Sequence, residues 1–160
     1  QGEVPDVVLY PTGGGTGLIG MWKAFDEMEA LGWVPKGRRP RFVSVQAAGC
    51  APVVKAFSGG SERTEPWPNP QTHAYGLRVP APLGGFLCLR ALRATRGTAI
   101  AIDDDEADRA TLALAARSGI DVCPEGGAAW AALAKLRVSG FIGATDKVVV
   151  FNTGTGMKYR

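Results

Sequence analysis

The sequence predicts an α/β fold, a three-layer sandwich in which a mostly parallel sheet is covered by helices on both faces. Two observations support this prediction. Short apolar, β-branched runs alternate along the chain with longer stretches in which apolar residues recur every three or four positions. Glycines follow several of these longer stretches, as they commonly follow helices. The alternation indicates strands connected by helices, and therefore strands that run parallel.

The first elements follow from apolar spacing. Residues 7–10 are an apolar run that Pro11 ends, as expected of a short buried strand. Residues 18–31 carry apolar side chains at three- and four-residue steps, which predicts a helix that ends at Gly32. A second apolar run predicts a strand at 41–45.

The middle of the chain contains a long irregular segment. A short helix is expected at 50–57, but residues 58–82 hold three glycines and five prolines without any periodic pattern. A loop of this length in a compact domain is usually functional or packed on another surface. Helical spacing returns at 83–95, and an apolar run predicts a strand at 98–102.

The remaining elements complete the alternation. The acidic run from Asp103 to Glu106 opens a helix that ends before Gly119. Carboxylates at a helix start accept hydrogen bonds from free N–H groups and interact favourably with the positive end of the helix dipole. Capping is therefore favoured over a metal site. The chain then suggests a weak strand at 120–123, an alanine-rich helix at 126–139 and a last strand at 147–151.

Composition excludes several classes of function. The 160 residues fit one domain, and their net charge of +3 is too mild for a typical nucleic-acid surface. No apolar run approaches the ~18 residues of a membrane span. The three cysteines are far apart and lack metal-ligand spacing, which predicts buried, reduced thiols in a cytoplasmic protein. They are Cys50, Cys88 and Cys123.

The turn after the first strand is the candidate binding site. Four glycines lie between residues 13 and 17, immediately before a predicted helix. Glycines expose backbone N–H groups, and with the N-terminus of the following helix they form a concave anion site. A strand-to-helix connection without a ligand would need only one or two glycines. The turn therefore predicts phosphate binding.

Two nucleotide-binding motifs offer alternative interpretations of this turn. Residues 15–20 match the G-x-G-x-x-G pattern of dinucleotide-binding sites. That pattern expects an acidic residue at the end of the second strand, where Gln46 stands instead. A P-loop fits less well, because no Gly-Lys-Ser/Thr follows the glycines. A nucleotide-binding module without chemistry stays as an alternative.

Four blocks of sequence, in order along nearly the whole chain, resemble the threonine synthase branch of the fold type II (tryptophan synthase β-like) pyridoxal-phosphate enzymes. Threonine dehydratases and cysteate synthases of this superfamily share parts of them. The set is more specific than the glycine turn alone. The blocks are "PTGGGTGLIGMWKAF", "NPQTHAYGLRVPAPLGGFLCLRAL", "CPEGGAAWAALAKL" and "FNTGTGMKY".

The resemblance implies roles for two segments. In the family, the glycine loop holds the phosphate of pyridoxal 5'-phosphate through backbone N–H groups. The threonine of the tail motif Thr-Gly-x-Gly-x-Lys bonds the pyridine nitrogen. Many threonine synthases have asparagines in this loop, so its all-glycine form is closer to dehydratases. The implied cofactor-binding residues are Gly13, Gly14, Gly15, Thr16, Gly17 and Thr153.

One expected residue of the family is absent. Its members bind the cofactor as a Schiff base on a lysine in a Ser-x-Lys segment before the glycine loop. None of the lysines here has that setting, so no catalytic residue is assigned. The resemblance implies that residues 1–160 are the C-terminal part of the large domain. The N-terminal half, with that lysine, is expected outside this chain, which should be inactive alone.

The full enzyme is expected to be a lyase of threonine biosynthesis that converts O-phosphohomoserine and water to threonine and phosphate. A threonine or serine dehydratase is the alternative within the superfamily. The expected partners are a small amino-acid substrate, the N-terminal half and a second copy in a homodimer. Neither nucleic acid nor membrane is expected.

Three further polar side chains are candidates for a functional site. His73 is the single histidine and has no nucleophile or acid close in sequence, which argues against catalysis. Glu125 stands at the start of a predicted helix, where capping is favoured over chemistry, although a place near the cofactor ring is plausible. Gln46 could face the same cleft but receives no role.

Overall fold

The computed structural model describes residues 3–159, which contain one four-stranded sheet in the order β3-β2-β1-β4. The central strand β1 (Val7–Pro11) pairs with β2 (Arg41–Ala47) on one side and β4 (Val148–Val150) on the other. The edge strand β3 (Thr98–Ile102) pairs with β2. All three pairings are parallel, as the sequence predicted.

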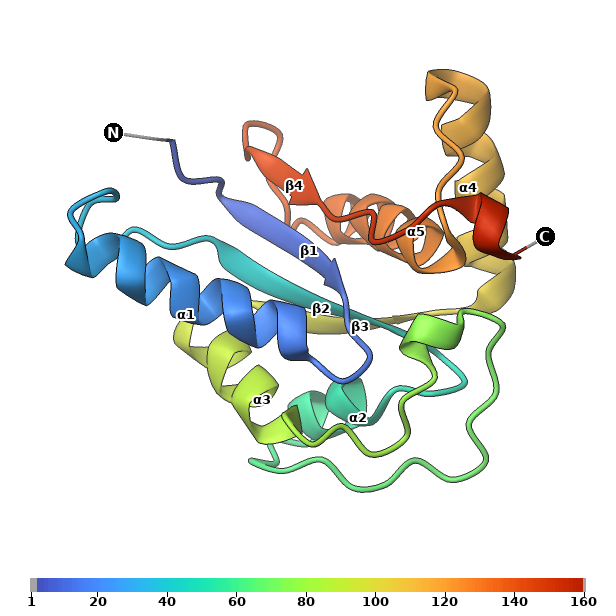
Figure 1. The fold of residues 1–160 in the computed structure, drawn as a ribbon, viewed down its shortest axis with the longest axis horizontal. Helices are drawn as coiled ribbons and strands as arrows, with labels where there is room; N and C mark the ends of the chain where they lie inside the picture. Colours follow the sequence, from blue (N-terminus) through green and yellow to red (C-terminus); the bar gives the residue numbers. More distant parts are fainter. Residues whose placement is uncertain (1–2, 160) are drawn as a thin grey trace.

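Helices cover both faces of the sheet and confirm the three-layer sandwich (Figure 1). One face carries α1 (Thr16–Ala30), α2 (Pro52–Ser58) and α3 (Gly85–Ala94). On the other face, α5 (Pro124–Val138) lies across the strands, and α4 (Asp104–Ser118) packs mainly on α5. Among the described residues, no helix combines the length and apolarity needed to cross a membrane.

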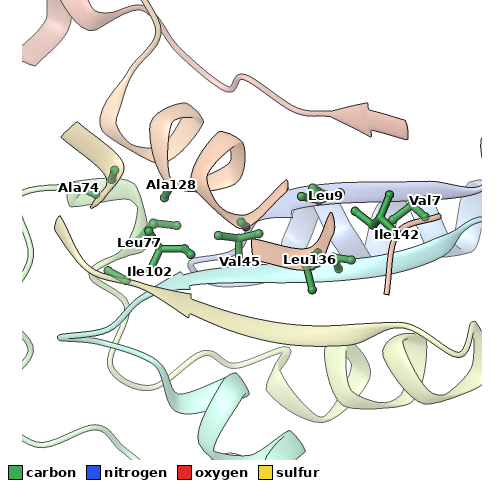
Figure 2. Close-up of a cluster of buried hydrophobic side chains, with 13 residues drawn as sticks. Val7, Leu9, Val45, Ala74, Leu77, Ile102, Ala128, Leu136 and Ile142 are labelled. Carbon is green, nitrogen blue, oxygen red and sulfur yellow. The ribbon is translucent and has the colours of Figure 1, made fainter. Parts of the chain in front are cut away.

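Each face of the sheet has its own apolar core, because successive strand residues point to opposite faces. Val7 and Leu9 of β1 point toward α5 and join the cluster that Figure 2 shows, together with Leu77 from the long irregular segment. Val8, between them in sequence, faces α1 and α3 and packs with Phe42. The central strand is thus buried on both sides.

The weak strand predicted at 120–123 is wrong. Val122 forms only an isolated antiparallel bridge with Thr155, outside the four-stranded sheet. The next residue, Cys123, precedes Pro124 and serves as the N-terminal boundary of α5. The long segment at 58–82 is irregular, as predicted, apart from the end of α2 and the 3-10 turn η1 (Tyr75–Leu77).

The strand order reverses between β1 and β4. The chain leaves β1 through α1 on one face to reach β2, whereas β4 is reached through α4 and α5 on the opposite face. In open parallel sheets, ligands bind beyond the carboxyl ends of the strands at such a reversal. The segments that follow these two strands are residues 12–15 and residues 151–155, the latter continuing into η2 (Gly156–Tyr159).

Candidate functional site

The glycine loop, residues 13–17, connects β1 to α1. Thr12 anchors its start by donating its backbone N–H to the carbonyl of Val45 at 2.7 Å. Gly15 precedes α1 with φ of +86°, a conformation that L side chains rarely adopt. A Cβ on Gly13 would overlap the carbonyl oxygen of Gly76, so the loop and η1 are in backbone contact.

The N–H groups of this loop are free to bind an anion. Across residues 3–159, no protein acceptor takes a hydrogen bond from the N–H of Gly13, Gly14 or Gly15. Thr16 and Gly17 are the first two residues of α1, where helical N–H groups have no partner within the helix, and no side chain caps them. The helix dipole adds positive potential at the same place. This donor set suits a phosphate group.

The structure brings the glycine loop and Thr153 to one cavity of about 360 Å³, at the strand-order reversal. Thr153 follows β4, and its Oγ1 lies 3.9 Å from the Sγ of buried Cys123. The volume is within the range of ~300–1,000 Å³ that is usual for small-molecule sites. All six residues predicted from the sequence line this cavity: Gly13, Gly14, Gly15, Thr16, Gly17 and Thr153.

Glu125 is a cavity residue whose main contacts the sequence did not reveal. Its side chain is only 4% exposed. Oε1 accepts a hydrogen bond from the backbone N–H of Gly76 at 2.7 Å and another from the Tyr159 hydroxyl at 2.5 Å. Burial raises the pKa of the Glu125 carboxyl, but hydrogen bonds from Tyr159, the Glu125 backbone, Cys123 and Gly76 together outweigh it and leave that pKa below its ordinary value. The cavity therefore contains a carboxylate.

Tyr159 closes one side of the cavity from the C-terminal turn η2. Burial and the Glu125 carboxylate raise the pKa of its phenol well above the ordinary range, so the hydroxyl stays a donor. Its ring stacks on Tyr75, with centroids 6.0 Å apart. The neighbouring Lys158 also lines the cavity. The C-terminal turn thus contributes an aromatic ring and a cation to the site.

Gln46 lies outside this cavity. It is fully buried, and its Oε1 accepts the N–H groups of Val53 and Val54 at the start of α2, at 2.8 and 3.1 Å. Its Nε2 donates to the carbonyl of Thr12 at 3.1 Å. Gln46 is thus committed to the backbone of α2 and of residue 12 and does not take the place of the acidic residue that a dinucleotide site expects.

His73 also lies apart from the cavity, although the fold gives it partners that the sequence did not indicate. Its ring nitrogens lie 3.2 Å from Asp104 and 2.9 Å from Asp108, both on α4. In the same helix, Glu106 accepts the N–H of Asp103 in a capping box, which confirms the predicted capping role of the acidic run.

The cysteines are buried and form no disulfide, as predicted. Burial raises the pKa of the Cys88 thiol to about 11. Cys123 lines the cavity, and burial likewise raises its pKa. These thiols are therefore protonated at neutral pH and are not poised as nucleophiles.

Together, the fold and the cavity define a doubly wound α/β protein whose glycine-loop cavity has the donor set suited to a phosphorylated small molecule. Residues 1–154 match the family described as "Pyridoxal-phosphate dependent enzyme", and the chain belongs to that family. The resemblance drawn from the four sequence blocks is thereby confirmed, and the cofactor of the family is pyridoxal phosphate.

Curated relatives place the chain near threonine synthases. It is 33% identical to threonine synthase of Methanocaldococcus jannaschii and 35% identical to that of Methanosarcina acetivorans. Each match covers 98% of this chain but only 38% of the relative. A solved threonine deaminase isoform 2 from Solanum lycopersicum has the same fold, with a TM-score of 0.73 at 16% identity. That match covers 99% of this chain and 43% of the other.

Proposed function

We propose that this chain is the cofactor-binding part of a lyase that converts O-phosphohomoserine and water into threonine and phosphate. The observation that carries the proposal is the meeting of the glycine loop and Thr153 at one cavity, in a chain at least 33% identical to two threonine synthases. Because the chain spans well under half of those relatives, the reaction is proposed for a larger enzyme that includes it.

The loop and the tail threonine would bind opposite ends of the cofactor. The free N–H groups of residues 13–15 and the N-terminus of α1 would hold its phosphate. The Thr153 hydroxyl would contact the pyridine nitrogen without forcing it to stay protonated, unlike the Asp found in other pyridoxal enzymes. Bound pyridoxal phosphate supplies an electron sink for carbanion chemistry.

Proton transfer would come from outside these residues. Lys158 is the one lysine among the described residues that lines the cavity, and it belongs to the tail motif rather than to a Ser-x-Lys segment. We therefore propose that residues 1–160 belong to the C-terminal part of the large domain and that a preceding segment supplies the lysine. Large exposed apolar side chains, such as Leu83 at 96% and Val138 at 91%, agree with burial against that segment or a second copy in a homodimer.

A threonine or serine dehydratase is the second candidate, and the all-glycine loop favours it. Product analysis separates the two. The enzyme that includes this chain is incubated with O-phosphohomoserine in one reaction and with threonine in another. Release of phosphate together with threonine from the first supports the proposal. Release of ammonia and a 2-oxo acid from the second, with no product from the first, would replace the synthase by the dehydratase.

A further inference from the structure

Three segments that are distant in sequence meet at the Glu125 carboxylate. Glu125 belongs to the first turn of α5, Gly76 to η1 and Tyr159 to η2. A single oxygen, Oε1, accepts both the Gly76 N–H at 2.7 Å and the Tyr159 hydroxyl at 2.5 Å. Glu125 itself is buried, and both hydrogen bonds end on this one oxygen, so its loss would release Gly76 and Tyr159 together.

Gly76 is also in direct contact with the glycine loop. Its carbonyl oxygen would overlap a Cβ placed on Gly13, so the two backbones approach more closely than any side chain at residue 13 would allow. On its other side, Gly76 has the Glu125 carboxylate, whose Oε1 would lie 2.9 Å from a Cβ on Gly76. Gly76 is therefore held between Glu125 and the glycine loop. A shift of the Glu125 side chain would be transmitted through Gly76 to the loop.

The stacked rings reinforce this arrangement. Tyr159 stacks on Tyr75, the residue before Gly76, at an interplanar angle of 13°. The Arg78 guanidinium lies 4.8 Å from the centre of the Tyr75 ring. The aromatic pair and the Glu125 hydrogen bonds thus fix the same turn from two sides.

We infer that Glu125 is a positioning residue: by holding Gly76 and Tyr159, it sets the shape of the glycine loop and couples phosphate affinity to the docking of the C-terminal turn. The inference rests on the proposed function only for the identity of the ligand. Because coupling between two sites is reciprocal, bound cofactor should in turn stabilise the docked state of Tyr159.

The test uses the ¹⁵N-labelled 160-residue chain and the backbone amide signals of residues 13–17. E125L removes the acceptor, E125Q keeps an acceptor oxygen, and Y159F removes only the hydroxyl. The control is E106Q, which removes a carboxylate from the first turn of α4, where it pairs with Lys135. The dissociation constant for pyridoxal phosphate is measured on each variant by fluorescence.

The inference predicts that the loop amide signals move in E125L, move less in Y159F and E125Q, and stay in place in E106Q. The dissociation constant should rise about tenfold in E125L, the loss expected from one or two hydrogen bonds. Loop signals that stay at their wild-type positions in E125L, while the Gly76 signal moves, would overturn the inference. If E125L does not fold, Y159F and E125Q decide between the same two outcomes.

The same experiment tests the proposed cofactor site independently of the role of Glu125. A wild-type chain whose loop signals do not respond to pyridoxal phosphate would contradict the cofactor site proposed for it. The amide signals of the unliganded variants would still show whether Glu125 positions the loop.

Discussion

The glycines of the loop differ in what requires them. Gly13 is required by contact with the Gly76 carbonyl, and Gly15 by its φ of +86°. Gly14 has neither constraint: its φ is not positive, and no protein atom lies within 4 Å of a Cβ placed on it. It nevertheless lines the cavity. A backbone contact explains Gly13 and a left-handed conformation explains Gly15, whereas Gly14 is best explained by the approach of a ligand to the backbone.

This difference gives a paired prediction. G14A should leave the free energy of unfolding unchanged or raise it by about 0.4–1 kcal/mol, because alanine has a less flexible unfolded chain. It should also weaken pyridoxal phosphate binding, because the methyl group would intrude where the phosphate is proposed to bind. G13A should lower the free energy of unfolding by about 1–3 kcal/mol through overpacking. Urea titration and fluorescence binding measure both effects. Unchanged cofactor affinity in G14A would mean that the phosphate lies elsewhere.

Thr153 offers a test at the other end of the proposed cofactor site. Thr153 is exposed, and its hydroxyl makes a long contact of 3.9 Å with the Cys123 thiol, so the hydroxyl contributes little to folding. T153V should therefore retain stability but bind pyridoxal phosphate roughly 2- to 10-fold more weakly, the range expected for one hydrogen bond. T153S, which keeps the hydroxyl, serves as the control. Equal affinities in the two variants would remove Thr153 from the site.

At the scale of elements, Gln46 connects β2 to both α2 and the start of the loop. Q46L would leave the Val53 and Val54 N–H groups and the Thr12 carbonyl without their partner. We expect a loss of about 1–3 kcal/mol in the free energy of unfolding. Ser44, two residues earlier on β2, is the matched control, because its buried hydroxyl has no hydrogen-bond partner within the described chain.

S44A should accordingly be neutral or stabilising, since it removes a buried polar group that gains nothing from burial. Both substitutions lie within β2. Their effects on strand propensity should therefore be small compared with the effect of losing the Gln46 hydrogen bonds. Chemical unfolding of the two variants in parallel measures the comparison. If S44A were as destabilising as Q46L, the hydrogen bonds of Gln46 would not be the reason for its burial.

The features that could be predicted from the sequence are those with a local sequence pattern. Strands and helices with strong apolar periodicity, such as β1 and α1, were predicted because their pattern is local. The weak strand at 120–123 was wrong: its only pairing is the bridge between Val122 and Thr155, and a local apolar run does not show whether a pairing partner exists. The glycine loop and Thr153 could be assigned because each belongs to a family motif. The contacts of Glu125 with Gly76 and Tyr159 have no local signature and need the assembled fold.

For the whole molecule, Glu125 makes stability depend on pH. Its folded-state pKa lies below the ordinary value of 4.5, so its ionised form contributes stability that is fully present above about pH 4.5 and is lost as pH falls through the folded pKa. E125Q does not titrate. The difference in unfolding free energy between wild type and E125Q should therefore shrink on acidification. Other paired carboxylates, such as Asp146 with Arg41, titrate in both proteins and cancel.

Urea unfolding of both proteins from neutral pH down to about pH 3 measures this difference. A difference that stayed constant or grew toward acid would mean that the hydrogen bonds to Glu125 do not favour its charged form. The Y159F variant should show a smaller pH dependence than wild type, because one of the donors that lower the Glu125 pKa is then missing.

The last prediction concerns the division of the site between this chain and the rest of the proposed enzyme. If the lysine that carries the cofactor lies outside residues 1–160, borohydride reduction of the isolated chain with pyridoxal phosphate should give weak labelling spread over several lysines. The chain joined to a segment with Ser-x-Lys should give one labelled lysine, in that segment. Peptide mass spectrometry distinguishes the two. Lys158 is the informative alternative, because it lines the cavity: stoichiometric labelling there, abolished by K158A, would show that the isolated chain carries its own attachment site.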